Sequence, residues 1–158
     1  MNKALSLALA ATLSCASLNS EAQTMIGKTT DVAAIANGDR MNAETLWAMG
    51  RIGGAAASPD GKTVVYQVGY YSVKQNKSHQ MLYTVSADGK KQHSLTTTAA
   101  SESDATWIDG GKRIAFLTGG QLWSMNADGT DRRQLTKSKI DIEGYIFSPD
   151  EKKVILIK

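Results

Sequence analysis

The sequence predicts an all-β protein: a β-propeller of four-stranded antiparallel blades, with two complete blades and part of a third present, preceded by a short helix. Two observations lead to this prediction. Residues 122–136, LWSMNADGTDRRQLT, repeat residues 82–96, LYTVSADGKKQHSLT, forty positions later without a gap, and six of the fifteen positions are identical. Residues 147–156 align on residues 107–116 in the same way. Self-similarity at this period, with two turn signals in each unit, is typical of a propeller.

Residues 1–22 have the composition of a secretory signal peptide. Lys3 supplies a positive charge, residues 4–13 contain only Ala and Leu apart from one Ser and one Thr, and residues 20–22 place small side chains where a signal peptidase cuts. We therefore expect cleavage before Gln23 and a periplasmic or secreted protein.

Cys15 is the only cysteine in the chain. Cleavage before Gln23 would leave a mature protein without a thiol, which excludes disulfides, thiolate metal sites and a cysteine nucleophile. The alternative is a lipoprotein in which Cys15 carries the lipid. Thr12 argues against it, because such signals usually carry Leu at that place. The intact mass of the mature protein distinguishes the two cases.

Residues 23–54 are expected to form a leader and a short docking helix. The leader is polar and rich in small residues. Residues 41–49 then have a helical pattern, with Asn42 suited to cap the first turn and Gly50 suited to the exit. The apolar face of this helix would dock on the main body, which is a packing role.

The propeller is expected to occupy residues 55–158, with blade 1 at 55–96, blade 2 at 105–136 and a partial blade 3 at 144–158. The strands of the second unit are expected at residues 105–108, 113–118, 121–126 and 132–135. The second strand of each unit contains VVY, IAF or VIL, so it is apolar at consecutive positions. Such a strand needs apolar neighbours on both faces, which a blade between two other blades provides.

Short turn motifs separate the expected strands. Ser58-Pro59-Asp60-Gly61 has the residues of a type I turn, and Gly119-Gly120 is suited to a tight hairpin. Asp109 and Gly110 are one place out of register with the Pro-Asp pairs of the first and third units, which predicts an irregular turn there.

Residues 69–79, GYYSVKQNKSH, are an insertion where the second unit has only Gly119-Gly120. Two interpretations are open. A long polar hairpin with Tyr70 and Tyr71 at its base could reach a neighbouring domain or a partner. Alternatively, the segment is a solvated loop tolerated at the edge of a blade.

The third unit contains only its first two strands before Lys158. Because propellers close with roughly four to eight blades, the sequence is expected to be the N-terminal portion of a longer protein or a truncated product. Residues 23–158 expressed alone should aggregate or unfold non-cooperatively, and a sharp, reversible two-state denaturation of a monomer would contradict this.

Composition excludes some partners. The net charge is +3 and the basic residues are scattered among acidic ones, whereas a nucleic-acid-binding protein concentrates them on one face. No stretch reaches the 18 or so apolar residues that a membrane-spanning helix needs.

Part of the second repeat, residues 124–135, resembles the start of a calcium-binding loop. Ser124, Asn126, Asp128 and Gly129 fit the first positions of an EF-hand loop, but position twelve is Leu135 where a bidentate Glu is required. A hairpin turn explains the motif, so no metal ligands are assigned.

Catalytic and cofactor motifs are absent from the sequence. There is no Gly-x-Ser-x-Gly elbow, and the two histidines, His79 and His93, are expected to be solvated rather than catalytic. Residues 50–54, GRIGG, lack the spacing of a dinucleotide or phosphate loop. No catalytic, cofactor-binding or metal-binding residue is therefore assigned, no cofactor is expected, and this segment alone is expected to be non-catalytic.

The motifs SPDGKTVVY, WIDGGKRIAF and FSPDEKKVIL, together with residues 122–136, resemble the TolB-type propeller repeat. Combined with the signal peptide, residues 42–47 and the insertion at residues 73–77, they are similar to the N-terminus of secreted serine peptidases of the prolyl oligopeptidase family, of the dipeptidyl-peptidase 5 type, from Gram-negative bacteria.

The resemblance implies a propeller that caps a C-terminal α/β-hydrolase domain and filters the peptides that reach its catalytic triad. It implies peptides and that hydrolase domain as partners, and allows a homodimer of the full-length protein. No hydrolase domain precedes Lys158, so none of the family's catalytic residues can be assigned to a position of this sequence. The peptide specificity cannot be inferred from it either. The alternative is a non-catalytic, TolB-like periplasmic propeller that binds a protein partner.

Overall fold

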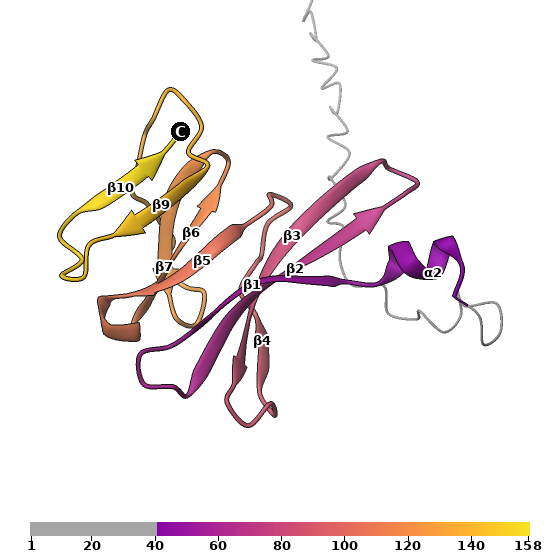
Figure 1. Ribbon diagram of the computed structural model, residues 1–158, viewed down its shortest axis with the longest axis horizontal. Coiled ribbons are helices and arrows are strands. Elements are labelled where there is room, and N and C mark those ends of the chain that lie inside the picture. The colour runs from indigo at the N-terminus through magenta and orange to yellow at the C-terminus, as the bar shows by residue number, and fades with distance from the viewer. Residues whose placement is uncertain (1–40) are drawn as a thin grey trace, which may run out of the picture.

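The computed structural model describes residues 41–158, so the expected signal peptide and most of the expected leader lie outside the described residues (Figure 1). In chain order the elements are α2 (Ala43–Ala48), β1 (Arg51–Ala57), β2 (Thr63–Ser72), β3 (Lys77–Ser86), β4 (Gln92–Ser94), β5 (Ser103–Ile108), the 3₁₀ turn η1 (Asp109–Gly111), β6 (Arg113–Thr118), β7 (Gln121–Asn126), β8 (Arg133–Gln134), β9 (Gly144–Phe147) and β10 (Val154–Ile157).

The strands form three antiparallel sheets. Sheet 1 has the order β1-β2-β3-β4, sheet 2 has the order β5-β6-β7-β8, and β9 pairs with β10 in a hairpin. Sheet 2 lies between sheet 1 and the β9–β10 hairpin, so the three follow one another in chain order (Figure 1). The prediction of an all-β protein with four-stranded antiparallel sheets and a small helix is confirmed.

Strand β6 is buried on both faces, as its run of apolar residues predicts. Ile114 and Phe116 lie in a core shared with sheet 1, and Ala115 and Leu117 lie in a second core shared with the β9–β10 hairpin. At about 25 cal/mol for each Å² of apolar surface removed from water, these two cores are the main attraction between neighbouring sheets. Other residues of the first core are Val65, Leu82, Leu95 and Met125.

The identical positions of the repeat make the same hydrogen bonds in both sheets. The N–H of Leu82 donates to Thr96 Oγ1 at 2.8 Å, and the N–H of Leu122 donates to Thr136 Oγ1 at 2.9 Å. The leucine just before each threonine donates its N–H back to the same third-strand residue at 2.8 Å. The repeat is therefore a repeat of backbone pairing as well as of sequence.

The predicted type I turn is confirmed at Ser58. The Gly61 N–H donates to the Ser58 carbonyl at 2.9 Å, and Ser58 Oγ donates to the Asp60 carboxylate at 2.6 Å. The hydrogen bond from Ser58, with one from the Lys62 N–H, holds the pKa of Asp60 below its ordinary value. The same serine-to-aspartate bond recurs at Ser86–Asp88 and Ser148–Asp150.

Some boundaries differ from the prediction. Strand β1 begins at Arg51 rather than Ala55, and its pairing with β2 is irregular between Ile52 and Ala55, where Gly53 and Gly54 lie. Strand β8 has only two residues. The irregular turn expected at Asp109 is a 3₁₀ turn whose first residue has a φ of 52°.

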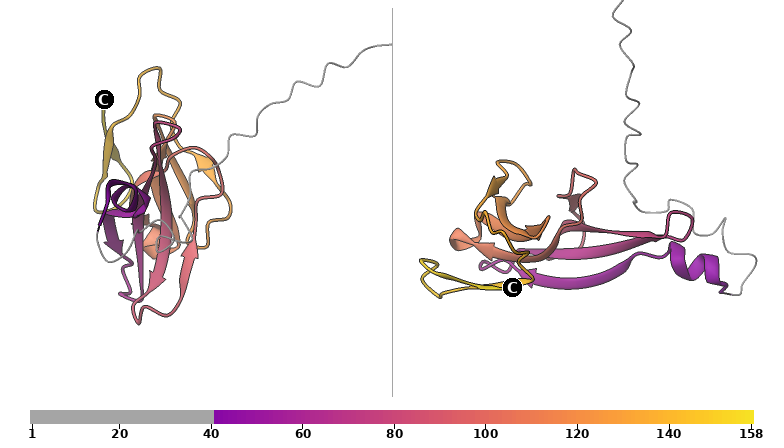
Figure 2. Two further views of the ribbon diagram at one scale, coloured as in Figure 1. Left: turned by 90° about the vertical axis from the view of Figure 1, so that its right-hand side faces the viewer. Right: turned by 90° about the horizontal axis from the view of Figure 1, so that it is seen from above.

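The insertion continues strands β2 and β3. Residues 69–72 pair with residues 77–80, and we call this part of the hairpin, residues 69–80, the arm. Figure 2 shows the arm reaching away from sheet 2, with α2 beside it. The base of the arm is buried, with Tyr70 and His79 only 7% and 2% exposed, whereas residues 73–78 are exposed to solvent. The segment is therefore a paired hairpin with a solvated tip, and its contact with a partner stays a prediction.

Helix α2 is capped as predicted. The Asn42 carboxamide oxygen accepts a hydrogen bond from the Thr45 N–H at 2.7 Å, which satisfies a donor that the first turn leaves open. The helix packs against β2, where the Trp47 and Tyr71 rings meet edge to face with centroids 5.7 Å apart. The helix therefore contacts β2, but Leu46 of its expected docking face stays 43% exposed, so docking through that apolar face remains a prediction.

Candidate functional site

Three hollows in the described residues have polar or charged side chains in their walls, and the smallest, of about 310 Å³, lies at the turns that contain Lys62 and Asp88. The other two are larger. The first lies between the segment that links the two sheets, residues 98–102, and sheet 2, and it has a volume of about 420 Å³. The second lies where α2 meets the arm and has a volume of about 400 Å³. We call them the inter-sheet hollow and the arm pocket.

A buried ion pair forms one wall of the inter-sheet hollow. Glu102 is fully buried, accepts a hydrogen bond from Thr96 Oγ1 at 2.8 Å, and pairs with the guanidinium of Arg132 from sheet 2. Burial raises the pKa of Glu102, and the hydrogen bond from Thr96 and the positive charge of Arg132 offset this only in part. The pair thus joins the segment after sheet 1 to the outer edge of sheet 2.

The guanidinium of Arg132 has further protein partners. It donates to the Leu95 carbonyl at 3.3 Å and lies 4.9 Å from the centroid of the Phe116 ring. The carboxylate of Glu102 and the guanidinium of Arg132 neutralise each other. The ion pair therefore has a structural role: it links the segment after sheet 1 to sheet 2.

A second polar contact between the sheets lies near their first strands. Trp107 Nε1 on β5 donates to the Ala56 carbonyl on β1 at 2.9 Å. Together with the ion pair, this bond fixes sheet 1 against sheet 2. We call the contact between the two sheets the seam.

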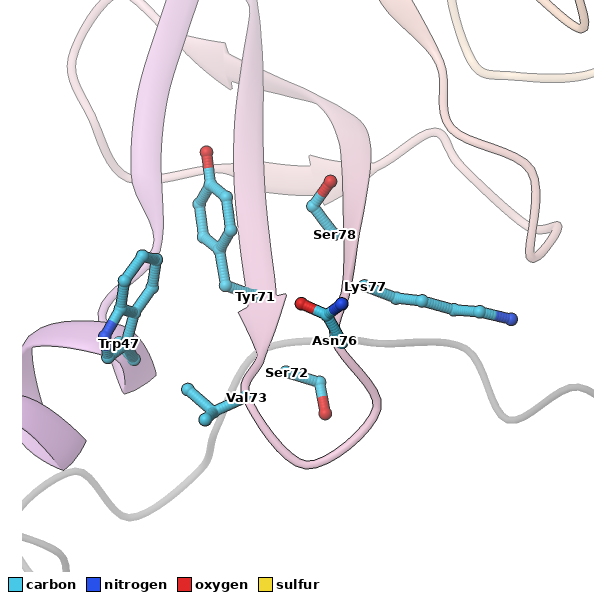
Figure 3. Close-up of a pocket in the computed structure, with 7 residues that line it drawn as sticks. All are labelled: Trp47, Tyr71, Ser72, Val73, Asn76, Lys77 and Ser78. Atoms are coloured by element: carbon cyan, nitrogen blue, oxygen red, sulfur yellow. The ribbon is translucent and has the colours of Figure 1, made fainter.

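The arm pocket is walled by aromatic and polar side chains (Figure 3). Trp47 comes from α2, Tyr71 from the end of β2, and Val73 from the turn of the arm. In Figure 3 the Trp47 and Tyr71 rings lie close together on one side, and the Lys77 side chain points away from them. The remaining lining residues are Ser72, Asn76 and Ser78.

The guanidinium of Arg51 lies against both aromatic rings of this pocket. It is 4.8 Å from the Trp47 ring centroid and 4.4 Å from the Tyr71 ring centroid. Cation–π contacts of this length hold a guanidinium while leaving its N–H donors available.

The histidines do not form a site. The expectation that His79 is solvated is wrong: it is buried, with Nε2 3.1 Å from the Ala100 carbonyl, because the segment after β4 folds back against β3. His93 is exposed on β4, as expected. His79 lies near the start of β3 and His93 lies on β4, and neither lines the inter-sheet hollow or the arm pocket.

The residues with partial likeness to an EF-hand loop belong to strand β7 and the turn that follows it. The Asp128 carboxylate accepts hydrogen bonds from the Thr130 N–H and hydroxyl, at 2.9 and 2.6 Å. Ser124 Oγ accepts a hydrogen bond from Arg113 at 3.0 Å. Within residues 41–158, no group of three or more His, Cys, Asp or Glu side chains is placed to hold a metal ion.

Sequence reasoning missed the ion pair and the role of Arg51. Glu102 lies in a short polar segment, SESD, that looks like a linker, and no local pattern marks it as buried. Arg51 lies in the glycine-rich stretch at residues 50–54, whose spacing carries no sign of the aromatic rings beside the guanidinium. In the part of the chain that the structure describes, no helix has the length and apolar character needed to cross a membrane.

Comparison with known proteins connects this architecture to peptidases. No family model matches the chain. It is 42% identical over 119 residues to dipeptidyl-peptidase 5 of Porphyromonas endodontalis, an alignment that covers 73% of this chain and 17% of the relative. The chain is a relative of dipeptidyl-peptidase 5. The enzyme of that name from Porphyromonas gingivalis is 41% identical over 125 residues, covering 77% of this chain and 18% of the relative.

The chain therefore spans less than a fifth of the length of these dipeptidyl-peptidase 5 relatives. A solved structure of Pyrococcus horikoshii acylaminoacyl peptidase matches with a TM-score of 0.58 at 15% identity, covering 71% of this chain and 18% of that one. An acylaminoacyl peptidase in complex with a chloromethyl ketone matches with a TM-score of 0.59. The likeness to these structures is one of fold, and the resemblance to dipeptidyl-peptidase 5 is confirmed by sequence.

Proposed function

We propose that this chain is the N-terminal propeller segment of a periplasmic serine dipeptidyl peptidase or oligopeptidase, and that it gates peptide access to a catalytic α/β-hydrolase domain. The observation that carries the proposal is the 42% identity to dipeptidyl-peptidase 5. Residues 1–22 would be the signal peptide, residues 23–54 the leader and helix, and residues 55–158 the propeller segment.

The geometry of the two sheets supports their assignment as blades. They repeat the same hydrogen bonds at the same positions, and they pack face to face over one core. Propellers are built from four-stranded sheets that repeat in this way around a central channel. In this assignment the β9–β10 hairpin starts the third blade.

Gating requires that neighbouring blades do not separate. The seam meets this requirement, since Trp107 bonds to Ala56 and Arg132 pairs with Glu102. Apolar packing of Val65 against the side chains of sheet 2 fills the space between these contacts. A peptide would then reach the hydrolase domain through the channel rather than between these two blades.

An inhibitor experiment tests the peptidase assignment. The full-length natural protein is assayed on fluorogenic dipeptidyl substrates with and without a serine-directed inhibitor. We expect release of the fluorophore that the inhibitor abolishes. Absence of inhibitor-sensitive release would overturn the proposal and favour the TolB-like propeller that binds a protein partner without catalysis.

A further inference from the structure

The arm pocket exposes apolar side chains around one hollow. Trp47, Tyr71 and Val73 keep 41%, 36% and 68% of their surface exposed. Aromatic side chains at a concave, exposed site are the residues most enriched in protein interfaces. The hollow of about 400 Å³ has room for an apolar side chain, and the hydroxyl and amide groups in its wall, from Ser72, Asn76 and Ser78, can bond to a peptide backbone.

Arg51 adds a positioned positive charge to this pocket. Its guanidinium lies against the Trp47 and Tyr71 rings, and none of the ion pairs in residues 41–158 includes it. The two rings restrict its motion, so less conformational entropy is lost when a carboxylate binds. The planar donors of a guanidinium match the two oxygens of a carboxylate.

The surrounding surface has the same sign of charge. Residues 41–57 and 63–86, which contain α2, β1 and the arm, carry three strong bases, Arg51, Lys74 and Lys77, and one acid, Glu44. Positive charges near a binding site, such as Lys74 and Lys77 of the arm, raise the rate at which an acidic partner associates, even where they do not touch it.

We infer that the arm pocket docks an acidic protein segment that carries an apolar anchoring side chain. The anchor enters the hollow beside Trp47, and a flanking carboxylate binds Arg51. A hollow lined by hydrogen-bonding groups favours a peptide over a membrane surface, which would contact a broad apolar patch without entering a pocket. This inference does not depend on the proposed peptidase function.

Binding of a defined peptide to the full-length natural protein tests this inference. The probe is a fluorescein-labelled peptide, blocked at both ends, in which leucine and phenylalanine are flanked by two glutamates and two aspartates. Binding is measured by fluorescence anisotropy. We expect saturable binding that weakens about tenfold or more in Arg51→Gln and in Trp47→Ala. The analogue with glutamine and asparagine in place of the acids should bind about tenfold more weakly.

Arg133→Gln is the matched control because Arg133 is exposed, pairs with Asp131 and lies on sheet 2, away from the arm. It removes the same charge and should leave binding unchanged. Arg51→Lys keeps the charge but loses the planar donors, so it should bind with intermediate affinity, and circular dichroism checks that each variant is folded.

Four results would overturn the inference. They are no binding of the acidic peptide to the wild-type protein, equal binding of the neutral analogue, equal weakening in Arg133→Gln, and unchanged affinity in folded Arg51→Gln. Trp47-dependent binding to phosphatidylglycerol vesicles without peptide binding would indicate a membrane surface instead. Dissociation of a dimer by Trp47→Ala, again without peptide binding, would indicate a second copy.

Discussion

The carboxylate of Glu102 and the guanidinium of Arg132 form a buried ion pair that joins the segment after sheet 1 to the edge of sheet 2. The two residues are thirty positions apart in the chain. Glu102 is fully buried, whereas 22% of the Arg132 side chain is exposed. The consequence of breaking the pair therefore depends on which partner is removed.

Replacing Arg132 alone should destabilise the protein strongly. Arg132→Met leaves the Glu102 carboxylate buried and uncompensated, which costs about 3–5 kcal/mol of unfolding free energy. The double variant Glu102→Leu with Arg132→Met removes both charges and should recover most of this loss. Urea denaturation of the full-length natural protein, followed by tryptophan fluorescence, measures the loss of stability in the single and the double variant. Equal destabilisation by the single and double variants would contradict the expected coupling.

The raised pKa of Glu102 predicts a pH dependence of stability. Both the folded and unfolded states are protonated well below the ordinary Glu pKa of 4.5. As pH rises past that value, the unfolded state loses the proton first, so the folded state binds more protons and the contribution of Glu102 to stability falls. Glu102→Gln should remove this pH-dependent contribution to the free energy of unfolding. If the free energy of unfolding of the wild type rose relative to that of Glu102→Gln as the pH increased, the expected direction would be contradicted.

Tyr145 is expected to stabilise the contact between sheet 2 and the β9–β10 hairpin. Its buried hydroxyl donates to the Ala115 carbonyl at 2.9 Å and also to the Asp104 carbonyl, and burial raises the pKa of Tyr145. Tyr145→Phe should lower the unfolding free energy by about 1–2 kcal/mol, measured by denaturation. Tyr71→Phe, at an exposed ring, is the control and should change stability little. Equal effects would argue against the hydrogen bond.

The sequence could predict the parts of the fold that local patterns determine. Residues 113–118 and 121–126 have the predicted bounds because glycines end each strand and the apolar run requires burial on both faces. The Asp60 and Asp128 turns follow from hydrogen bonds within a few residues.

The remaining features depend on contacts that no local pattern records. His79 is buried by a segment twenty-one positions away, and Glu102 by a partner from sheet 2. Strand β1 extends through a glycine-rich stretch because Arg51 and Ile52 pair with β2 beyond an irregularity at the glycines. Arg51 is a candidate binding residue because α2 and the arm place two aromatic rings beside it, which no local pattern records.

The most direct test of the proposed gating role compares substrates of different size. The full-length natural protein should cleave a fluorogenic dipeptidyl substrate and leave intact casein uncut, because only short peptides pass the channel. Weakening the seam in a folded Trp107→Phe, Arg132→Lys double variant should raise casein cleavage relative to cleavage of the short substrate. Casein cleavage by the wild type at a rate comparable to the short substrate, unchanged in the variant, would contradict the proposed gate.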